Sequence, residues 1–207
     1  KDVLDFYQGI TTDFIDATFS SNHDQPRLLN DLKQDPAKYK QALAILMTLP
    51  GAPYLYYGEE IGMLGLKPDE QIREPFLWDA KEKDTRRARW IEPKYSTDAS
   101  VTPLAQQRVD GSSYFNHYKK VIALRQSNPA LAIGSLESVK QIYPKSVMAF
   151  IRRTANQELL VVHYLGSKGM EFQIPEGFKS SIYTTEGVTV KKGIMYLPAN
   201  SSLILKK

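Results

Sequence analysis

The stretch Phe19-Ser20-Ser21-Asn22-His23-Asp24-Gln25-Pro26-Arg27 determines how the rest of this chain is interpreted. Directly after an apolar run, it places an amide, an imidazole, a carboxylate and a guanidinium within six positions. Pro26 disfavours helical geometry at Gln25, so a turn is predicted. Taken alone, the pattern also fits a structural turn in which Asn22 or Asp24 caps a helix, because turns favour these residue types. The segments on either side must decide between a structural and a functional turn.

A strand, a helix and a second strand are predicted around this turn. A short helix is expected to end near Gly9, and residues 14–19 indicate a short buried strand. The helix is expected over residues 35–49, with Pro36 at its first position after an Asp cap. Its apolar positions follow helical spacing: Tyr39, Ala42, Leu43, Leu46 and Met47. The second strand is expected over residues 54–57.

This strand-helix-strand order is typical of parallel sheets, in which ligand sites gather where the strands end. The second strand is followed by Gly58-Glu59-Glu60-Ile61-Gly62-Met63. We therefore expect the Asn-His-Asp and Glu-Glu groups to be neighbours on one rim. The alternative for Glu59 and Glu60 is that they are acids in a first helical turn, favoured by the helix dipole.

Residues 64–112 form a long polar stretch with four prolines and both tryptophans. Loops of this length are usually functional or disordered, and the aromatic content argues against disorder. Phe76 and Trp78 either pin the loop to the body or stack on a ligand. A second helix is expected over residues 113–127, with His117 off its apolar face and on the surface.

After Pro129, short β-branched and aromatic runs alternate with turn residues. Strands are expected over residues 136–143, 147–154, 158–165, 170–174, 180–185, 188–191, 194–197 and 202–206. This regular spacing predicts an antiparallel sandwich or barrel of about 75 residues. His163 lies within one of these strands, and we expect its role to be structural.

The composition excludes several classes of protein. The net charge is +4, and the densest basic run, Arg86-Arg87-Ala88-Arg89, is too short to indicate a nucleic-acid partner. The absence of cysteine excludes disulfides and thiolate metal sites. No apolar run is long enough for a membrane span, and no signal peptide is visible. Because the chain begins at Lys1 in mid-pattern, we expect a piece of a longer protein; a secreted or periplasmic location is preferred.

Four segments, in order, resemble the C-terminal part of the alpha-amylase family of glycoside hydrolases. Residues 19–24 match the family's Phe-x-x-Asn-His-Asp motif at the end of the seventh barrel strand, and residues 50–63 resemble the eighth strand and its exit. Residues 73–78 are similar to an Arg-x-Pro-Met-x-Trp segment, with Phe76 in place of Met. Residues 118–131 resemble the final barrel helix, and the β-rich tail matches the C-terminal sheet domain.

The resemblance implies an α/β fold followed by an all-β part. Residues 1–130 are expected to be the last two strand-helix units of a (β/α)8 barrel, and residues 131–207 an antiparallel β-sandwich. The implied substrate is an alpha-glucan such as starch or a maltooligosaccharide, and the implied reaction is retaining hydrolysis or transfer. This reaction needs a carboxylate nucleophile and a carboxylic acid about 5–5.5 Å apart.

In the family, both groups come from earlier strands, and no Gly-x-Arg-x-Asp nucleophile segment occurs here. The chain is therefore expected to be inactive alone and to need the remainder of the barrel as its partner. No cofactor or metal ligand is expected in this chain. Calcium is expected, if anywhere, in the missing part, since no Asp-rich loop here has calcium-site spacing.

The resemblance assigns five site residues. Asp24 corresponds to the family's third carboxylate, beside the nucleophile and the general acid. The resemblance implies that it binds ring hydroxyls of the sugar, stabilises the developing positive charge and helps to keep the general acid protonated. His23 and Arg73 are expected to bind substrate, Asn22 to brace the turn, and Arg27 to pair with a neighbouring acid.

The alternative is a non-catalytic protein whose β-rich tail is a carbohydrate-binding or interaction module. Its candidate binding residues are the aromatics of the tail: Tyr143, Phe150, Tyr164, Phe172, Tyr183 and Tyr196. Aromatic residues in a small sandwich are more often part of the core, and that interpretation is preferred here.

Overall fold

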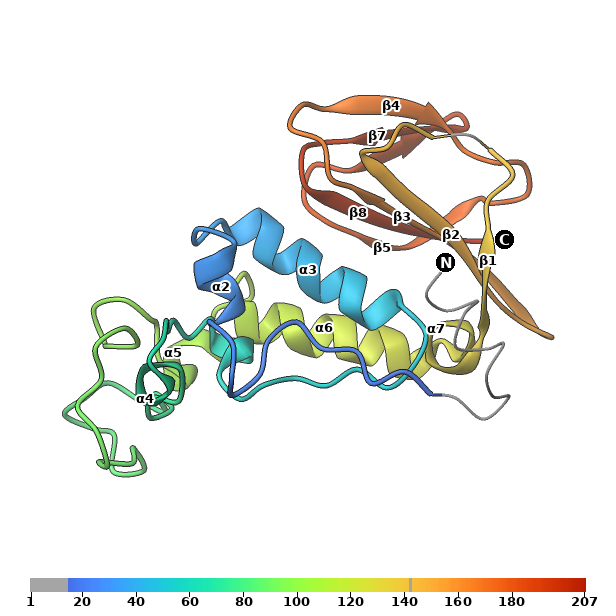
Figure 1. Cartoon of the computed structure of the whole chain (residues 1–207). Helices are drawn as coiled ribbons and strands as arrows, with labels where there is room; N and C mark the ends of the chain where they lie inside the picture. Colours follow the sequence, from blue (N-terminus) through green and yellow to red (C-terminus); the bar gives the residue numbers. More distant parts are fainter. Residues whose placement is uncertain (1–14, 142) are drawn as a thin grey trace.

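A computed structural model describes residues 15–141 and 143–207 of the chain. The helix expected near Gly9 lies outside the described residues. In Figure 1 the helices and loops occupy one side of the molecule and the strands the other. The change from helices to strands falls between Ile133 and Ser135. The division into domains at residue 130 stays a prediction.

Two helices, α3 and α6, form the body of the first part. The helical elements are α2 Leu28–Asp31, α3 Pro36–Thr48, η1 Glu59–Ile61, α4 Asp69–Ile72, α5 Leu104–Gln107, α6 Tyr114–Ser127 and α7 Pro129–Ile133. The Asp35 carboxylate accepts hydrogen bonds from two backbone N–H groups at the start of α3, and the Ser113 hydroxyl accepts one at the start of α6. Both predicted helices are thereby confirmed to within a residue at each end.

The two predicted strands on either side of α3 are extended segments that pair in parallel at one bridge, between Phe19 and Tyr54. The Ala52 N–H donates to the Asp16 carbonyl, and the Tyr54 N–H donates to the Thr18 carbonyl, both at 2.7 Å. The parallel arrangement is as predicted, but regular strands are absent from these described segments. Two neighbouring strands without further partners are only marginally stable, which explains the short ladder.

The second part contains two antiparallel sheets. The strands are β1 Ser135–Ser138, β2 Val147–Thr154, β3 Gln157–Tyr164, β4 Met170–Gln173, β5 Ser180–Thr184, β6 Thr189–Lys191, β7 Ile194–Leu197 and β8 Ser201–Lys206. The sheet orders are β1-β2-β3-β8-β5 and β4-β7-β6. The predicted antiparallel sandwich is confirmed. Seven of the eight predicted strands lie within two residues of the observed ones, whereas the strand predicted over residues 136–143 ends earlier, at Ser138.

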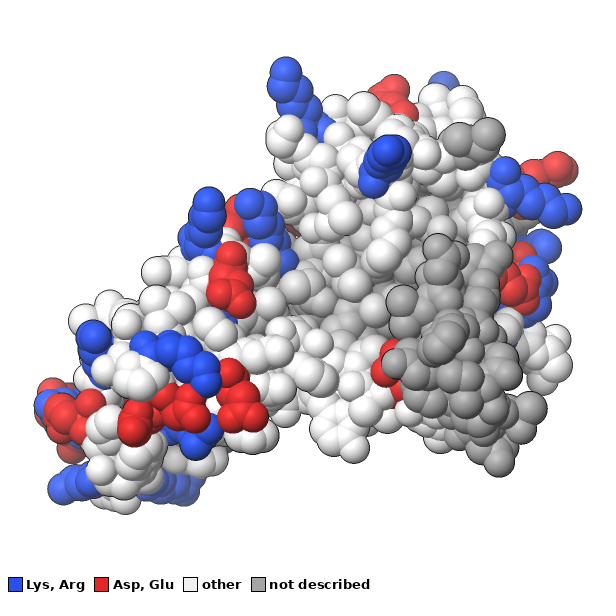
Figure 2. Space-filling model, in the orientation of Figure 1, with Lys and Arg blue, Asp and Glu red and all other residues white. Residues whose placement is uncertain are grey.

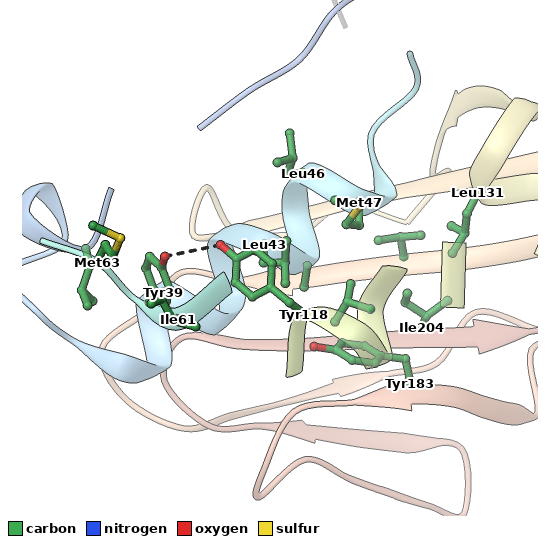
Figure 3. Packing of buried hydrophobic residues seen from close by; sticks show 14 of the residues in the cluster. Tyr39, Leu43, Leu46, Met47, Ile61, Met63, Tyr118, Leu131, Tyr183 and Ile204 are labelled. Carbon is green, nitrogen blue, oxygen red and sulfur yellow. Dashed lines mark hydrogen bonds between the residues drawn. The ribbon is translucent and has the colours of Figure 1, made fainter. Parts of the chain in front are cut away.

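The larger sheet lies between the helices and the smaller sheet, as Figure 1 shows. Along β3, Leu159 and Val161 join the apolar cluster that contains α3 and α6, whereas Leu160 and Val162 join the cluster between the sheets. This alternation follows the two-residue period of a strand. Figure 3 shows the first cluster, with Tyr118 near the middle of the view.

The aromatic residues of the tail are mostly part of this packing. The buried or packed ones are Tyr143, Phe150, Tyr164, Phe172 and Tyr183. Tyr196 is the most exposed of the six aromatic residues, at 38%. The core interpretation therefore holds for five of these side chains, and they do not form a binding surface.

Five buried polar side chains join α3, α6 and the larger sheet: Gln41, Thr48, Arg125, Arg152 and His163; we call this set the junction. The Arg125 guanidinium donates to the carbonyls of Met47 and Leu49 at 2.8 Å, and to that of Gly51 at 2.7 Å. Positive charge at the C-terminal end of α3 also complements the helix dipole.

The sheet contributes the other half of the junction. Arg152 of β2 donates to the carbonyls of Thr48 at 2.6 Å and Gly134 at 2.8 Å. Gln41 of α3 donates in return to two sheet carbonyls, both at 2.8 Å. The β-rich part is thus fixed to α3 by specific hydrogen bonds as well as by apolar contact.

His163 has the structural role that was predicted. It is fully buried, with Nε2 2.9 Å from the Thr48 hydroxyl and Nδ1 2.8 Å from the Ser202 hydroxyl. Because the Thr48 hydroxyl donates to the Ala44 carbonyl, Nε2 carries the proton and Nδ1 accepts from Ser202. Burial lowers the pKa of His163 to about 3, so the ring is neutral.

The surface position predicted for His117 is wrong. Its side chain is half-buried, with Nε2 3.1 Å from the Lys40 carbonyl oxygen of α3. The ring of Tyr183 from β5 lies beside it, at 6.4 Å between centroids. Burial lowers the pKa of His117 to about 4. The apolar face of α6 did not reveal this, because the neighbours of His117, Lys40 and Tyr183, come from distant parts of the chain.

In the described part of the chain, no helix combines the length and hydrophobicity needed to cross a membrane.

Candidate active site

The Asn22-His23-Asp24 segment forms an exposed turn at the end of the first extended segment. The Asp24 N–H donates to the Asn22 side-chain oxygen at 2.9 Å, which closes the turn. Neither Asn22 nor Asp24 caps a helix, because α2 begins at Leu28 with Arg27 at its N-cap position. The structural alternative of a helix cap is therefore not what this turn provides.

Arg73 reaches across from the long loop to this turn. Its Nε donates to the His23 carbonyl at 2.9 Å, and its Nη2 lies 3.1 Å from Asp24 Oδ1. The other carboxylate oxygen of Asp24 lies 3.3 Å from His23 Nε2. Arg73 also pairs with Asp69, one helical turn earlier, at 2.7 Å. Four of the five predicted site residues are thus brought together.

We call Asn22, His23, Asp24, Asp69 and Arg73 the rim cluster. Asp69 is the member that the sequence analysis missed, and its spacing of four residues from Arg73 was the available signal. Its pKa is lowered, first by a hydrogen bond from Lys67. The Asp24 side chain is 62% exposed, so its oriented carboxylate remains open to a ligand.

The predicted pairing of Arg27 with an acid is wrong. Arg27 is buried, and its Nη1 donates to the Tyr57 carbonyl. Its guanidinium lies over the rings of Tyr56 and Tyr57, at 4.2 and 4.6 Å from their centroids. Within the described residues no acid lies in ion-pair distance of it. The prediction failed because the Arg27 side chain lies beneath the turn, where its neighbours are the rings of Tyr56 and Tyr57 and the Tyr57 carbonyl.

Glu59 lies beneath the turn and was not among the predicted site residues. The Ser21 hydroxyl donates to Glu59 Oε1 at 2.5 Å, and the Tyr39 hydroxyl donates to the Glu59 carbonyl at 2.6 Å. Burial raises the pKa of Glu59 to about 7. Glu59 is the first residue of η1, as expected of an acid in a first helical turn, and it also lies next to the Asn22-His23-Asp24 turn through Ser21.

The long loop that carries Arg73 is held by its own anchors. The Glu74 carboxylate is buried and accepts backbone N–H bonds from Lys94, Tyr95 and Ser96 at 2.6–3.1 Å. Leu77 is fully buried, whereas Trp78 is 39% exposed. Phe76 is partly buried and packs against the first apolar cluster, so the anchoring interpretation fits Phe76, whereas Trp78 is more exposed.

In the basic run of the same loop, Arg86-Arg87-Ala88-Arg89, the Arg87 side chain is neutralised by acids. Arg87 pairs with Asp84 at 2.9 Å and with Asp98 at 2.8 Å. Figure 2 shows Lys and Arg side chains interspersed with Asp and Glu at the end of the molecule formed by these loops. This mixture of charges is typical of a solvated loop and agrees with the absence of a predicted nucleic-acid site.

The rim cluster offers an oriented carboxylate flanked by an imidazole and a guanidinium. These groups accept and donate hydrogen bonds to hydroxyls, which suits a polyhydroxylated ligand. Within residues 15–141 and 143–207, no set of three or more His, Cys, Asp or Glu side chains is arranged to hold a metal ion.

Comparison with known proteins identifies the relatives of this chain. The alpha amylase catalytic domain matches residues 2–134, and the alpha-amylase SusG C-terminal domain matches residues 147–204. Alpha-amylase 3 of Dictyoglomus thermophilum is 36% identical over 195 residues, which cover 93% of this chain and 39% of that protein. Alpha-amylase SusG of Bacteroides thetaiotaomicron is 34% identical over 199 residues, covering 88% of this chain and 28% of that protein.

A solved structure supports the same relationship. The alpha-amylase from H. orenii superposes with a TM-score of 0.87 at 31% identity, covering 100% of this chain and 43% of that one. The chain therefore spans less than half the length of the relatives it matches.

Proposed function

Because the chain belongs to the alpha-amylase family of glycoside hydrolases, we propose that it is the C-terminal part of a longer retaining hydrolase acting on alpha-glucans such as starch and maltooligosaccharides. Two observations support this: the three relatives named above are alpha-amylases, and the chain spans 28–43% of their lengths. The remainder of the barrel, from the same longer chain, is the partner that completes the site.

The exposed and oriented carboxylate of Asp24 is the observation that carries the proposal. Both of its oxygens have a partner, His23 or Arg73, yet most of the side chain is accessible. In this proposal Asp24 accepts hydrogen bonds from ring hydroxyls and stabilises the oxocarbenium-like charge as the glucosidic bond breaks. Hydrogen bonds that tighten in the transition state lower the barrier directly.

His23 and Arg73 contact the same sugar in this proposal. The His23 side chain is 66% exposed, and that of Arg73 is 38% exposed, so both can exchange a carboxylate partner for a hydroxyl. Asn22 supports them from behind by accepting the Asp24 N–H. Arg27 supports the turn from below.

The chain alone is proposed to be inactive. The nucleophile and the general acid are supplied by the rest of the barrel, and Asp24 stabilises a transition state that those groups create. The exposed apolar residues beside the parallel bridge agree with this, since Ile15 is 72% and Tyr54 63% exposed. Such edges belong against further strands.

The test compares Asp24→Asn with Asp69→Asn in the longer hydrolase. Both substitutions remove one charge from the rim cluster, but only Asp24 is proposed to contact the reacting sugar. We expect Asp24→Asn to lower kcat on maltooligosaccharides by about 100-fold or more, as for the loss of other transition-state contacts. Turnover of starch by the purified 207-residue chain, abolished by Asp24→Asn, would refute the proposed inactivity.

A further inference from the structure

The turn that carries Asp24 is fastened at both of its ends to one segment, residues 56–65. Before the turn, the Ser21 hydroxyl donates to the Glu59 carboxylate at 2.5 Å. After the turn, the Arg27 guanidinium donates to the Tyr57 carbonyl, and the Arg27 N–H donates to the Gly65 carbonyl at 2.9 Å. The residues between these two fastenings make the contacts of the rim cluster.

The Ser21–Glu59 hydrogen bond continues the link between the two extended segments. Their described backbone pairing ends with the Tyr54 N–H donating to the Thr18 carbonyl. Ser21 lies two residues beyond Phe19, the residue of the parallel bridge, and directly before Asn22, where the turn begins. Ser21 and Glu59 are each 2% exposed, so water cannot readily replace this bond.

Glu59 is itself held rigidly. Its N–H donates to the Tyr56 carbonyl at 3.1 Å, and its carbonyl accepts the Tyr39 hydroxyl at 2.6 Å. Gly58, directly before it, has φ of +83°, and a Cβ there would lie 2.3 Å from the sulfur of Met63. The backbone before Glu59 therefore has a conformation that glycine permits, and the buried Glu59 carboxylate has the Ser21 hydroxyl as the partner of Oε1.

We propose that Glu59 is a positioning residue for Asp24: its carboxylate holds Ser21 and thereby sets the direction in which the catalytic turn leaves the barrel. The inference rests on the proposed function of Asp24 and adds a residue that touches neither substrate nor reacting atoms. An error of about 1 Å in the position of a catalytic group can cost about 100-fold in rate. A single buried hydrogen bond can thus matter for turnover.

The first experiment measures kcat and KM on maltooligosaccharides in the longer hydrolase. We expect Glu59→Ala to lower kcat by about 100-fold with little change in KM, because the misplaced contact is made mainly in the transition state. Glu59→Gln keeps an oxygen that accepts from Ser21, so it should restore kcat to within about threefold of the original value. Rescue by glutamine separates positioning from any need for the charge.

Two further variants serve as controls. Ser21→Ala removes the same hydrogen bond from the other side and should lower kcat as Glu59→Ala does. Glu60→Ala removes the adjacent carboxylate, whose side chain makes no hydrogen bond to the turn among the described residues, and should leave kcat unchanged. Equal losses in Glu59→Ala and Glu60→Ala would overturn the proposal, as would an unchanged kcat in Ser21→Ala.

The second experiment follows amide hydrogen exchange of residues 20–25 and 27 in the longer hydrolase. If the two variants have equal urea midpoints, faster exchange in Glu59→Ala than in Glu59→Gln supports the proposal. Equal exchange in the two variants overturns it.

The activity of Asp24→Asn distinguishes a failure of the proposed function from a failure of this inference. Full activity in Asp24→Asn would defeat the proposed function, whereas an inactive Asp24→Asn beside a fully active Glu59→Ala would defeat this inference alone.

Discussion

The junction and the rim cluster both consist of charged and polar side chains, but they are built in opposite ways. At the junction, Arg152 is fully buried and donates to backbone carbonyls of α3 and the chain before β1. At the rim, Asp24 is largely exposed and Arg73 partly exposed, and the two bind each other through their side chains. One region joins elements of the fold, and the other presents groups to solvent.

The difference shows where stability and chemistry reside in this chain. Removing a buried donor leaves its carbonyl partners without a hydrogen bond, which costs free energy of folding. Exposed ion pairs contribute little, because water and salt compete with them. The rim side chains can therefore exchange their partners at small cost, whereas the junction side chains cannot leave without loosening α3 from the sheet.

The largest effect is expected on the free energy of unfolding when a junction side chain is replaced. Arg152→Met should lower the free energy of unfolding by about 3 kcal/mol, because two buried carbonyls lose their donor. Arg153→Met, at the next position of β2, removes an exposed partner of Glu137 and Glu158 and should have no comparable effect. Urea unfolding of the two variants tests this. Equal destabilisation would mean that the junction bonds have no special importance.

The next effect is a dependence of stability on pH from the junction histidine. The pKa of His163 is about 3 in the folded protein and about 6.5 when unfolded, so only the unfolded chain gains a proton between these values. Stability is thus fully present above pH 6.5 and should fall by about 1.4 kcal/mol for each pH unit below it. His117 adds a loss of the same sign, since its folded pKa is about 4.

Glu59, beneath the rim, should oppose this trend. Its folded pKa of about 7 is above the value of 4.5 for a free carboxyl, so its contribution is present below pH 4.5 and is lost as the pH rises through 7. Urea unfolding between pH 5 and 6.5 separates the two regions. His163→Gln should flatten the acid loss of stability and Glu59→Gln should steepen it; the reverse pattern would contradict the assignment.

The smallest effect concerns stability at the rim itself. Arg73→Met removes the partner of Asp24 and Asp69, yet the urea midpoint of the chain should stay unchanged because these groups are exposed. A large fall in the midpoint would show that the rim cluster supports the fold, and would remove the contrast with the junction. In the longer hydrolase, the same variant should raise KM, since Arg73 is proposed to contact substrate.

The regular elements were predictable because their signals are local. The Asp35 cap with Pro36 defines the start of α3, and two-residue alternation defines β4, where Met170 and Phe172 alternate with polar residues. The parallel contact between residues 16–19 and 52–54 followed from the strand-helix-strand order. The helix start and the strand alternation depend on neighbours within a few positions, and the parallel contact depends on the order of consecutive elements.

The junction could not be predicted in this way. Its hydrogen bonds join residues far apart in sequence, such as Gln41 with the Ser201 carbonyl, 160 positions away. Nothing near Arg152 in the sequence indicates that its partners are carbonyls of α3 and Gly134. The surface position predicted for His117 was wrong for the same reason, since its neighbours are the Lys40 carbonyl, 77 positions away, and Tyr183 of β5.

The rim cluster was predictable in part. The motif itself brought Asn22, His23 and Asp24 together, and the resemblance added Arg73. Arg27 was misassigned because its charge suggested an acid partner, while the fold provides aromatic rings and a carbonyl instead. A tertiary neighbour can replace the partner that charge alone would suggest.

One pair of measurements tests the division between rim and junction most directly: kcat and the urea midpoint of Asp24→Asn and Arg152→Met in the longer hydrolase. We predict that Asp24→Asn lowers kcat by about 100-fold or more at an unchanged midpoint. Arg152→Met should lower the midpoint while its folded fraction keeps kcat. An Asp24→Asn enzyme that retains its turnover, or loses its midpoint together with its turnover, would contradict the proposed role of Asp24.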